Sequence, residues 1–252
     1  MPERNVFITG ASSGLGAGMA RRLAESGARV HAAARRGDLL EELARGAAGA
    51  AGEIVPVAID VTDTDALVER IRGIDEEVGG LDLVIANAGV GRNRSGRRLD
   101  WENDVAPLLK TNVVGAIATL TAVLPRMVER RRGHLVGVSS LAGFRGLPRS
   151  ATYSASKAAV TIFLESLRTD LAGTGVKVTC IHPGFIKTPM TDKNDFTMPF
   201  MLDCDEAVSL VLEGIERGAC VVEFPRKLAW ATKALRVLPD AAYQQIARRV
   251  LR

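Results

Sequence analysis

The chain has 252 residues and a net charge of +4, with 47% hydrophobic and 25% charged residues. Both fractions are near the average for soluble globular proteins, which excludes a disordered tail or a fibre. The length is at the upper limit of one domain, and a core of this size needs no disulfide or metal. The three cysteines lie far apart without metal-ligand spacing, which favours a reducing cytoplasm. We expect no secretory leader before the first apolar segment, and no stretch that reaches the ~18 apolar residues of a membrane span.

The positive charge is concentrated at the carboxyl end of the sequence. Residues 225–252 contain seven basic side chains and one acidic side chain, which gives a net charge of +6. Subtracting this from the +4 of the whole chain leaves −2 for residues 1–224. A body with balanced charge has no field that attracts DNA, so we expect no nucleic-acid partner.

Short apolar runs alternate along the chain with longer segments of helical periodicity. The expected strands are Val6–Thr9, Val30–Ala33, Val55–Ile59, Leu83–Ala86, Leu135–Ser139, Val176–Ile181 and Cys220–Phe224. The expected helices are Gly14–Ser26, Asp38–Arg45, Asp63–Val78, Val105–Glu129, Thr152–Leu171 and Asp205–Arg217. Continuous apolar runs are typical of strands buried on both faces. The alternation predicts one α/β domain over residues 1–224, a doubly wound parallel sheet of about seven strands with helices on both faces.

A glycine-rich turn joins the first strand to the first helix. Its sequence is Thr9-Gly10-Ala11-Ser12-Ser13-Gly14-Leu15-Gly16. Glycines allow a tight turn and a close approach of backbone to a pyrophosphate, and the helix N-terminus offers free N–H groups. Glycine and serine also form ordinary turns, but the position between the first strand and the first helix favours a dinucleotide site.

Two arginines, Arg35 and Arg36, follow the second strand. In a dinucleotide site this position faces the adenosine ribose, where an acid would bind the 2′-hydroxyl and an arginine accommodates a 2′-phosphate. A guanidinium is suited to bidentate phosphate binding. The alternative is a solvated pair at a strand end. We prefer NADP(H) over NAD(H) as the cofactor.

Two further motifs lie at strand ends. Asp60-Val61 follows the third strand, where the carboxylate can accept a hydrogen bond from the adenine amino group or cap the next helix. Asn87-Ala88-Gly89 follows the fourth strand, where small residues let a ligand approach the backbone and the amide can also hold a turn. The residues alone leave both pairs of alternatives open.

Tyr153 and Lys157 are four residues apart in a helical segment, so their side chains share one face. A tyrosine has a pKa of about 10, and a nearby ammonium lowers it, which suits proton exchange with a carbonyl or an alcohol. Ser139 and Ser140 end the fifth strand, and at most one of two adjacent strand residues readily faces the site. Asn112 is an amide in an apolar stretch, and the simplest interpretation is that it binds neighbouring backbone.

Together these motifs resemble the short-chain dehydrogenase/reductase family, in its NADP-preferring subgroup, which implies a Rossmann-type fold. The resemblance extends from Thr9 to about Phe224 and rests on the order and spacing of the motifs. They are TGASSGLG at 9–16, AARR at 33–36, DV at 60–61, NAG at 87–89, N at 112, SS at 139–140, YSASK at 153–157 and PGFIKT at 183–188. Ala86, where the family often has Asn, and Leu15, in place of Ile, are slight departures that leave the catalytic residues intact.

The resemblance implies a catalytic tetrad, in which the serine is the one that stands thirteen residues before the tyrosine: Asn112, Ser140, Tyr153 and Lys157. Tyr153 would be the acid/base on the substrate oxygen, and Ser140 would bind the same oxygen. Lys157 would bind the nicotinamide ribose and lower the pKa of Tyr153, and Asn112 would hold a water that links Lys157 to solvent. The nicotinamide end of the cofactor would meet Pro183, Gly184, Ile186 and Thr188. No metal is required.

These residues predict an NADP(H)-dependent oxidoreductase that transfers hydride between nicotinamide and a carbonyl or alcohol substrate, as a carbonyl reductase or alcohol dehydrogenase. One alternative is the same chemistry with NAD. Another is a regulator that senses NADP(H) without turnover, against which the complete tetrad argues. Family members are usually dimers or tetramers, so we expect a homodimer or homotetramer formed through the segments Val105–Glu129 and Thr152–Leu171.

The stretch between the sixth strand and Asp205 would be the substrate lid of this family. It is apolar and contains Phe185, Ile186, Met190, Phe196, Met198, Phe200, Met201 and Leu202. A methionine-rich surface adapts to varied hydrophobic ligands, which predicts an apolar aldehyde or ketone as substrate, and packing against the core or a subunit is the alternative. The loop after the fourth strand is expected to be solvated and carries Arg92, Arg94, Arg97 and Arg98. Structural roles are expected for the three histidines, His31, His134 and His182.

Residues 226–252 predict a tail of two short helices separated by Pro239. The second helix can be capped by Asp240 and repeats apolar residues at helical spacing, namely Tyr243, Ile246, Ala247, Val250 and Leu251. Apolar faces bordered by Arg and Lys suit an anionic membrane surface, and they equally suit docking on the domain or on a second subunit. We favour docking and keep peripheral membrane contact as the alternative.

Overall fold

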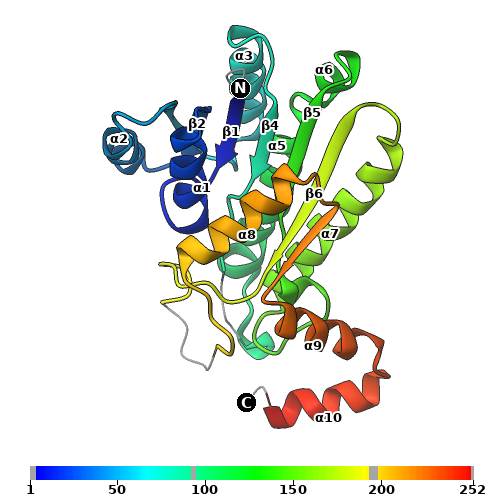
Figure 1. Ribbon diagram of the computed structural model, residues 1–252. Coiled ribbons are helices and arrows are strands. Elements are labelled where there is room, and N and C mark those ends of the chain that lie inside the picture. The colour runs from blue at the N-terminus through cyan, green and yellow to red at the C-terminus, as the bar shows by residue number, and fades with distance from the viewer. Residues whose placement is uncertain (1–3, 92–94, 193–197, 251–252) are drawn as a thin grey trace.

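The protein is built on one seven-stranded parallel sheet, and its computed structural model describes residues 4–91, 95–192 and 198–250, without the side chains of 248–250 (Figure 1). The strands are β1 Asn5–Thr9, β2 Arg29–Ala34, β3 Glu53–Ala58, β4 Leu83–Ala86, β5 Gly133–Val138, β6 Val176–Pro183 and β7 Val221–Phe224. Their order is β3-β2-β1-β4-β5-β6-β7. The chain reverses its direction of travel across the sheet between β1 and β4, and ligands of such sheets bind beyond the carboxyl ends of the strands at that point. The predicted doubly wound sheet is confirmed.

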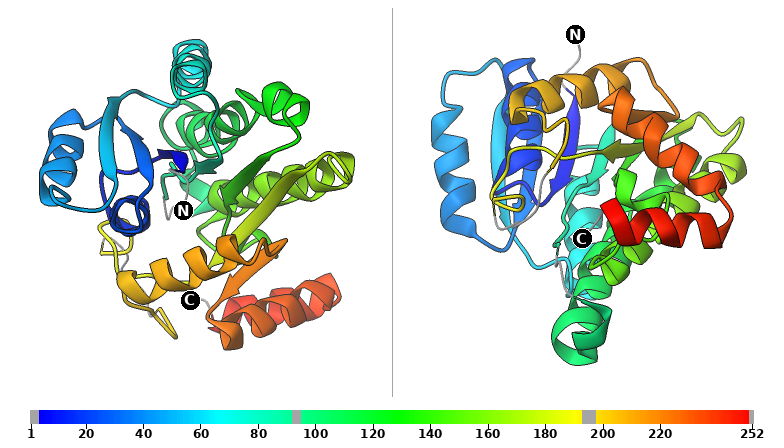
Figure 2. Two further views of the ribbon diagram at one scale, coloured as in Figure 1. Left: turned by 45° about the horizontal axis from the view of Figure 1, so that its top comes forward. Right: turned by 90° about the horizontal axis from the view of Figure 1, so that it is seen from below.

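Helices cover both faces of this sheet (Figure 2). One face is covered by α1 (Gly14–Glu25), α2 (Gly37–Gly46) and α8 (Cys204–Glu216). The other is covered by α3 (Thr64–Glu77), α5 (Ala116–Thr121) and α7 (Ala151–Asp170). Val6 and Ile8 of β1 pack toward the first group and Phe7 toward the second, because successive strand side chains point to opposite faces. Both apolar layers therefore share one sheet, which makes a single domain.

The segment that the sequence predicts as one helix over Val105–Glu129 is a broken helical run. It consists of the π-helical η2 (Trp101–Val105), α4 (Ala106–Leu109), the π-helical η3 (Lys110–Gly115), α5 and α6 (Leu124–Glu129). Pro125 lies in the first turn of α6, where its missing N–H is tolerated and an unbroken helix would be interrupted. At Gly115 a Cβ would lie 2.7 Å from the Val61 carbonyl oxygen, so the run passes close to the loop after β3.

Within the described ranges, one helical run, Trp101–Glu129, is long and apolar enough to span a membrane by length and composition alone. This finding corrects the expectation from the sequence that no stretch is long and apolar enough for a membrane span. In the structure 44% of the apolar window is buried within the protein, and Leu108 and Leu120 belong to its core. A core helix passes the same test of length and composition.

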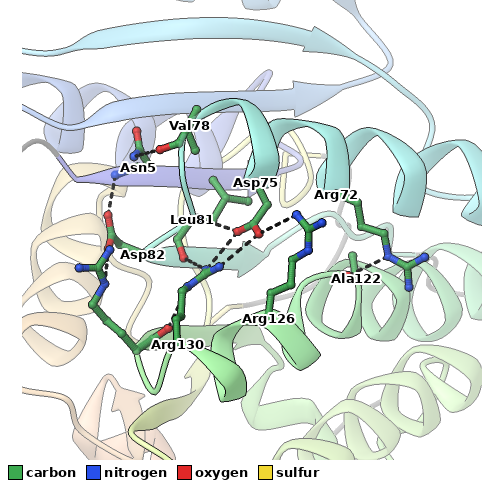
Figure 3. A network of polar contacts seen from close by, with 10 residues as sticks. Asn5, Arg72, Asp75, Val78, Leu81, Asp82, Ala122, Arg126 and Arg130 are labelled. Atoms are coloured by element: carbon green, nitrogen blue, oxygen red, sulfur yellow. Dashed lines mark hydrogen bonds and ion pairs between the residues drawn. The ribbon is translucent and has the colours of Figure 1, made fainter.

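A polar network joins the segments that precede β4 and β5, at the amino ends of the strands (Figure 3). Asp75 of α3 is 2% exposed and accepts hydrogen bonds from the Leu81 N–H at 2.7 Å and from Arg130 at 3.0 and 3.2 Å. Arg130 also donates to the Leu81 carbonyl at 2.6 Å, and Arg126 lies 3.6 Å from Asp75. A buried carboxylate is tolerated only with such partners. The network fastens α3 to the segment after α6 at the edge opposite the expected ligand site.

Two tail helices follow β7 as expected, α9 (Arg226–Val237) and α10 (Asp240–Val250). They lie at the end of the molecule where the strands end (Figures 1 and 2). Ala229 and Ala247 are buried, whereas Trp230 is 71% exposed. The tail therefore contacts the rest of the chain with one part of each helix and leaves another part in solvent.

Some predicted residues differ from expectation or lie outside the described part of the chain. Ile246, expected on the packed face of α10, is exposed, because that helix contacts its neighbours through Tyr243 and Ala247. Outside the described residues lie Arg92, Arg94, Phe196 and Leu251, together with the side chain of Val250.

Candidate active site

The glycine-rich turn lies at the end of β1, against the loop that follows β4. Gly10 has φ +70°, and a Cβ there would lie 2.7 Å from the Ala88 Cα. At Gly16 a Cβ would lie 2.3 Å from the Gly10 carbonyl oxygen. Gly14 has φ +54°, and a Cβ there would lie 3.1 Å from the Thr188 side chain. Only glycine fits these positions, which lets the backbone of the turn approach a ligand closely, as a pyrophosphate site requires.

Arg36 lies across this turn. Its Nη2 donates hydrogen bonds to the Ser12 and Ser13 hydroxyls at 2.9 and 3.1 Å. Ser13 is the N-cap residue of α1 and makes no side-chain hydrogen bond to that helix. Arg35 is exposed and lies 3.8 Å from the Asp60 carboxylate. Arg36 therefore places positive charge beside the N-terminus of α1, whereas Arg35 faces the Asp60 carboxylate.

Asp60 forms a turn and does not cap α3. Its carboxylate accepts from the Thr62 N–H at 2.9 Å. The cap is Asp63, which accepts from the Ala66 N–H at 3.3 Å. The sequence alternative that Asp60 caps the helix is therefore wrong, since Asp63 occupies the N-cap position. Val61, the next residue, is buried.

Asn87 joins the loops after β1 and β4. Its side-chain amide donates to the carbonyls of Thr9 and Gly10, both at 3.1 Å. The Thr9 hydroxyl accepts in return from the N–H groups of Asn87 and Ala88 at 3.1 and 3.2 Å. The Asn87 side chain therefore holds a turn, which is one of the two alternatives for this motif. It links the end of β1 to the loop after β4.

Ser140 follows β5, and its hydroxyl lies near that of Tyr153, in the first turn of α7. Ser140 Oγ also lies 3.4 Å from the Pro183 carbonyl oxygen. The neighbouring Ser139 faces α7, and its hydroxyl donates to the Lys157 carbonyl at 2.8 Å. Adjacent strand residues thus have different surroundings, and the serine that the resemblance selects is the one beside the tyrosine.

The Lys157 side chain is buried next to this pair. Its Nζ donates to the Val138 carbonyl at 2.9 Å and lies 5.8 Å from the centre of the Tyr153 ring. Burial lowers the pKa of Lys157 to about 8. Burial also raises the pKa of Tyr153, and the neighbouring Ser140 side chain acts in the opposite direction. The Lys157 ammonium is directed at the Val138 carbonyl.

Asn112 is buried in the π-helical η3 and pairs with the backbone of Val90. Its Oδ1 accepts from the Val90 N–H at 2.8 Å, and its Nδ2 donates to the Val90 carbonyl at 2.9 Å. The Nδ2 also donates to the Ser156 hydroxyl at 3.1 Å, and Ser156 donates to the Tyr153 carbonyl at 2.7 Å. The interpretation that this amide binds backbone is therefore correct, and that backbone belongs to the loop after β4. Single π-helical turns often occur at functional sites.

The predicted tetrad residues are close together in space. A Cβ on Gly89 would lie 3.4 Å from both Asn112 Oδ1 and Lys157 Nζ. Ser156, which links Asn112 to the tyrosine backbone, is a residue that the sequence analysis missed. It stands three residues after Tyr153, and residues at that spacing are neighbours on a helix, which is the signal that could have identified it.

The apolar lid approaches the tyrosine through Met190. A Cβ on Gly91 would lie 3.6 Å from the Met190 sulfur and 4.0 Å from a Tyr153 ring carbon. Met190 and Phe200 are exposed. Ile186, predicted at the nicotinamide end, has its side chain buried in the core cluster. The lid therefore contains both buried side chains that pack in the core and side chains that face solvent.

Gly184 and Thr188, also expected at the nicotinamide end, have different neighbours. A Cβ on Gly184 would lie 2.9 Å from the Leu228 side chain of α9. Thr188 packs against Gly14 of the glycine-rich turn. The segment after β6 thus runs from the tail helices to the start of α1, along the edge where the tetrad lies.

The three histidines are buried in strands. Burial lowers the pKa values of His31 and His134 to about 4 and also lowers that of His182. The His182 ring packs on Phe144 at 4.7 Å between ring centres. Among the residues that the structure describes, no group of three His, Cys, Asp or Glu side chains is placed to hold a metal ion.

A parallel sheet with a glycine-lined turn at its switch point, and with serine, tyrosine and lysine at the same edge, defines a dinucleotide-binding α/β protein. Residues 4–198 match the family described as short chain dehydrogenase. An uncharacterized oxidoreductase of Myxococcus xanthus is 55% identical over 250 residues, which cover 99% of this chain and 98% of that protein. The chain therefore belongs to the short-chain dehydrogenase family and is an oxidoreductase.

Two solved structures show the same architecture. A short-chain dehydrogenase from Sphingobium yanoikuyae in complex with NADPH has a TM-score of 0.83 at 27% identity, covering 98% of this chain and 96% of that one. A short-chain dehydrogenase from Mycobacterium paratuberculosis bound to NAD has a TM-score of 0.79 at 26% identity, covering 90% of this chain and 98% of that one. Structural relatives of this chain thus bind nicotinamide cofactors of both kinds.

Proposed function

We propose that this protein is an NADP(H)-dependent carbonyl reductase or alcohol dehydrogenase in which Tyr153 is the acid/base. The observation that carries the proposal is the proximity of the Ser140 and Tyr153 side chains beside the buried Lys157, at the sheet edge that also presents the glycine-rich turn. Two hydroxyls that meet there can contact one substrate oxygen together.

The nicotinamide, when bound, supplies or accepts the hydride. In the reductive direction Tyr153 gives its proton to the substrate oxygen, and Ser140 donates a hydrogen bond to that oxygen and orients it. Lys157 holds the ribose hydroxyls of the cofactor with its ammonium. Asn112 holds the loop after β4 against α7 and, through a water, connects Lys157 to solvent. Backbone N–H groups at the start of α1 bind the pyrophosphate.

The variant Tyr153→Phe tests this assignment. We expect the turnover rate to fall by about 10²- to 10⁴-fold, the range of general acid–base catalysis, while NADPH still binds. NADPH binding is measured by fluorescence titration, and turnover is followed through the cofactor absorbance. A variant that retains turnover would refute the assignment of Tyr153.

The preference for NADP(H) rests on Arg35 and Arg36, which follow β2 directly where an acid would favour NAD(H). Arg36 is already hydrogen-bonded to Ser12 and Ser13 of the cofactor turn, where a 2′-phosphate would add a partner of opposite charge. The NADPH complex of the Sphingobium protein agrees with this choice, and the NAD complex of the mycobacterial protein favours the alternative. A substrate panel run with NADPH and NADH in parallel distinguishes the two cofactors.

For the substrate we propose a hydrophobic aldehyde or ketone. Met190 and the Tyr153 ring both lie beside Gly91, and Phe200 of the same lid is exposed. Apolar groups with a flexible methionine among them favour apolar ligands of varied shape. Efficient turnover of only small charged substrates in the same panel would contradict this substrate class.

We further propose a homodimer or homotetramer that forms through the helical run Trp101–Glu129 and α7. Its support is the exposure of two β-branched side chains, Val114 at 49% and Ile162 at 55%. Light scattering on a size-exclusion column measures the mass. An Ile162→Glu variant is expected to shift that mass toward the monomer.

We propose that residues 1–224 form the catalytic domain and residues 225–252 the basic tail. We also propose a cytoplasmic location, because the three cysteines are free.

For the tail we propose docking on the domain, supported by the burial of Ala229 and Ala247. Co-sedimentation with anionic vesicles, with and without residues 226–252, tests the membrane alternative. Equal partitioning of both forms would exclude it, and tail-dependent binding would favour it.

A further inference from the structure

The loop 141–150, which leads from Ser140 to α7, is attached to the tail by Arg145. The Arg145 side chain is 20% exposed. It donates to the Arg236 carbonyl at 3.2 Å, to the Leu238 carbonyl at 3.4 Å and to the Asp240 carboxylate at 2.7 Å. These partners are 91 to 95 residues away in sequence and all belong to the junction between α9 and α10.

The chemistry of this junction suits a guanidinium. The last carbonyls of a helix have no partner within the helix, and a cation is favoured beside them. Arg236 and Leu238 present such carbonyls at the end of α9, and Asp240 is the first residue of α10. A planar fork of five donors serves the helix end and the carboxylate at the same time, which a lysine ammonium does less well. Arg145 therefore fixes both tail helices to one loop.

Tyr243 of α10 supplies a second attachment at the same place. Its ring lies 4.5 Å from the Arg145 guanidinium carbon, and its hydroxyl donates to the Gly146 carbonyl. The loop thus donates hydrogen bonds to the tail through Arg145, and the tail donates a hydrogen bond to the loop through Tyr243. Two contacts in opposite directions restrain the loop more than either contact alone.

The same loop is connected to the catalytic serine through Phe144. Its ring packs on His182, whose Nδ1 lies 3.5 Å from the Ser140 carbonyl oxygen. On the tail side, the Lys233 ammonium lies 5.8 Å from the Phe144 ring and pairs with Glu223 at 2.6 Å. A continuous set of contacts therefore runs from α9 and α10 through residues 144–146 to Ser140.

We propose that Arg145 is a positioning residue that latches the tail onto the loop between Ser140 and Tyr153, so that the tail sets how a large substrate is presented to these two hydroxyls. The inference rests on the proposed function and goes beyond it. The Asp240 side chain is 87% exposed, and exposed ion pairs add little stability. The effect of the latch is therefore on placement of the loop and not on folding.

The variant Arg145→Ala tests this role, with Arg226→Ala as the matched control because it removes the same charge from an exposed site in α9. We expect kcat/KM for large apolar carbonyl substrates to fall by about tenfold or more, since a displacement near 1 Å at a reacting centre costs up to about 10²-fold. The loss should lie mainly in KM, grow with substrate size and leave NADPH affinity and Tm unchanged. Arg145→Lys should restore part of it, and Arg226→Ala should behave as the wild type.

Hydrogen exchange of the peptide 141–150 gives a second readout that needs no turnover. Faster exchange in Arg145→Ala than in Arg226→Ala supports the latch, and equal exchange overturns it. An equal loss of kcat for every substrate together with a lower Tm would also overturn it, because that pattern indicates a structural role alone. If the wild type turns over no carbonyl substrate, the proposed function fails, and the exchange measurement still decides whether Arg145 holds the loop.

Discussion

The side chains of Ser140 and Tyr153 lie near each other, between a strand end and a helix start. The neighbouring Ser139 is instead turned toward the Lys157 carbonyl. The two adjacent serines therefore form a natural matched pair for mutation, with the same side chain in two environments.

The first prediction compares these serines. Ser140→Ala should lower kcat by roughly 10²-fold, because the substrate oxygen loses a donor that is already in place. Ser139→Ala should keep most of the turnover and cost about 1 kcal/mol of unfolding free energy, the value of one buried hydrogen bond. Steady-state kinetics and urea denaturation on both variants check this. An equal fall in kcat for the two would contradict the assignment of Ser140.

The second prediction concerns Arg36. Arg36→Ala should lower kcat/KM for NADPH by about tenfold or more, because a charge-assisted hydrogen bond contributes about 1.5–3 kcal/mol. The kcat/KM for NADH should change little, since that cofactor has no 2′-phosphate. Parallel assays with both cofactors measure the ratio, and Arg45→Ala in α2 is the control for loss of a nearby surface charge. An unchanged ratio in Arg36→Ala would remove Arg36 from the account of cofactor choice.

The third prediction is acid sensitivity from buried histidine. His31 is 2% exposed, neither ring nitrogen has a hydrogen-bond partner among the described residues, and its pKa is lowered to about 4. Because an unfolded histidine has a pKa of about 6.5, the unfolded state binds the extra proton between these values. The contribution of neutral His31 to the free energy of unfolding should therefore be fully present above pH 6.5. It should fall by roughly 3 kcal/mol as the pH decreases toward 4.

Urea midpoints at pH 7, 5.5 and 4.5 measure this loss. The variant His31→Leu should show a shallower decline of unfolding free energy over the same range than the wild type. Carboxylates contribute to the decline in both proteins, so the difference between the two curves is the informative quantity. Parallel curves would contradict the assignment to His31.

The fourth prediction concerns the network of Asp75. Arg130→Met should destabilise the protein by about 3 kcal/mol, because it removes the main partner of a buried carboxylate. Arg126→Met is the matched control and should cost under about 1 kcal/mol, since Arg126 is 42% exposed and lies at the edge of the network. Chemical denaturation measures both. Turnover at 25 °C should be unaffected, and equal destabilisation by the two variants would contradict this ranking.

Much of the fold follows from local patterns in the sequence. Runs such as Leu83–Ala86 are apolar throughout, which is possible only for a strand covered on both faces, and the structure has that strand with the same bounds. The tetrad residues were identified because Tyr153, Lys157 and the serine keep fixed spacings within a recognisable order of motifs. Their proximity then follows from a parallel sheet, whose strands all end at one edge.

The features that escaped prediction depend on contacts between distant residues. Asn112 pairs with Val90, and Arg145 with Asp240, and no local periodicity connects the members of either pair. The direction of the Lys157 ammonium is likewise decided by the Val138 carbonyl, an acceptor of a kind that every residue carries. Pro125 is a local signal for the break before α6. This signal was missed because the surrounding segment has continuous apolar periodicity.

The hydrogen bonds of Asn87 to Thr9 and Gly10, and of Arg36 to Ser12 and Ser13, act on the glycine-rich turn from two sides. A turn tied in this way is preorganised, so little conformational entropy remains to be lost when a dinucleotide arrives. The association rate should accordingly be governed by diffusion and by the attraction of the Arg36 charge, and should fall as ionic strength rises.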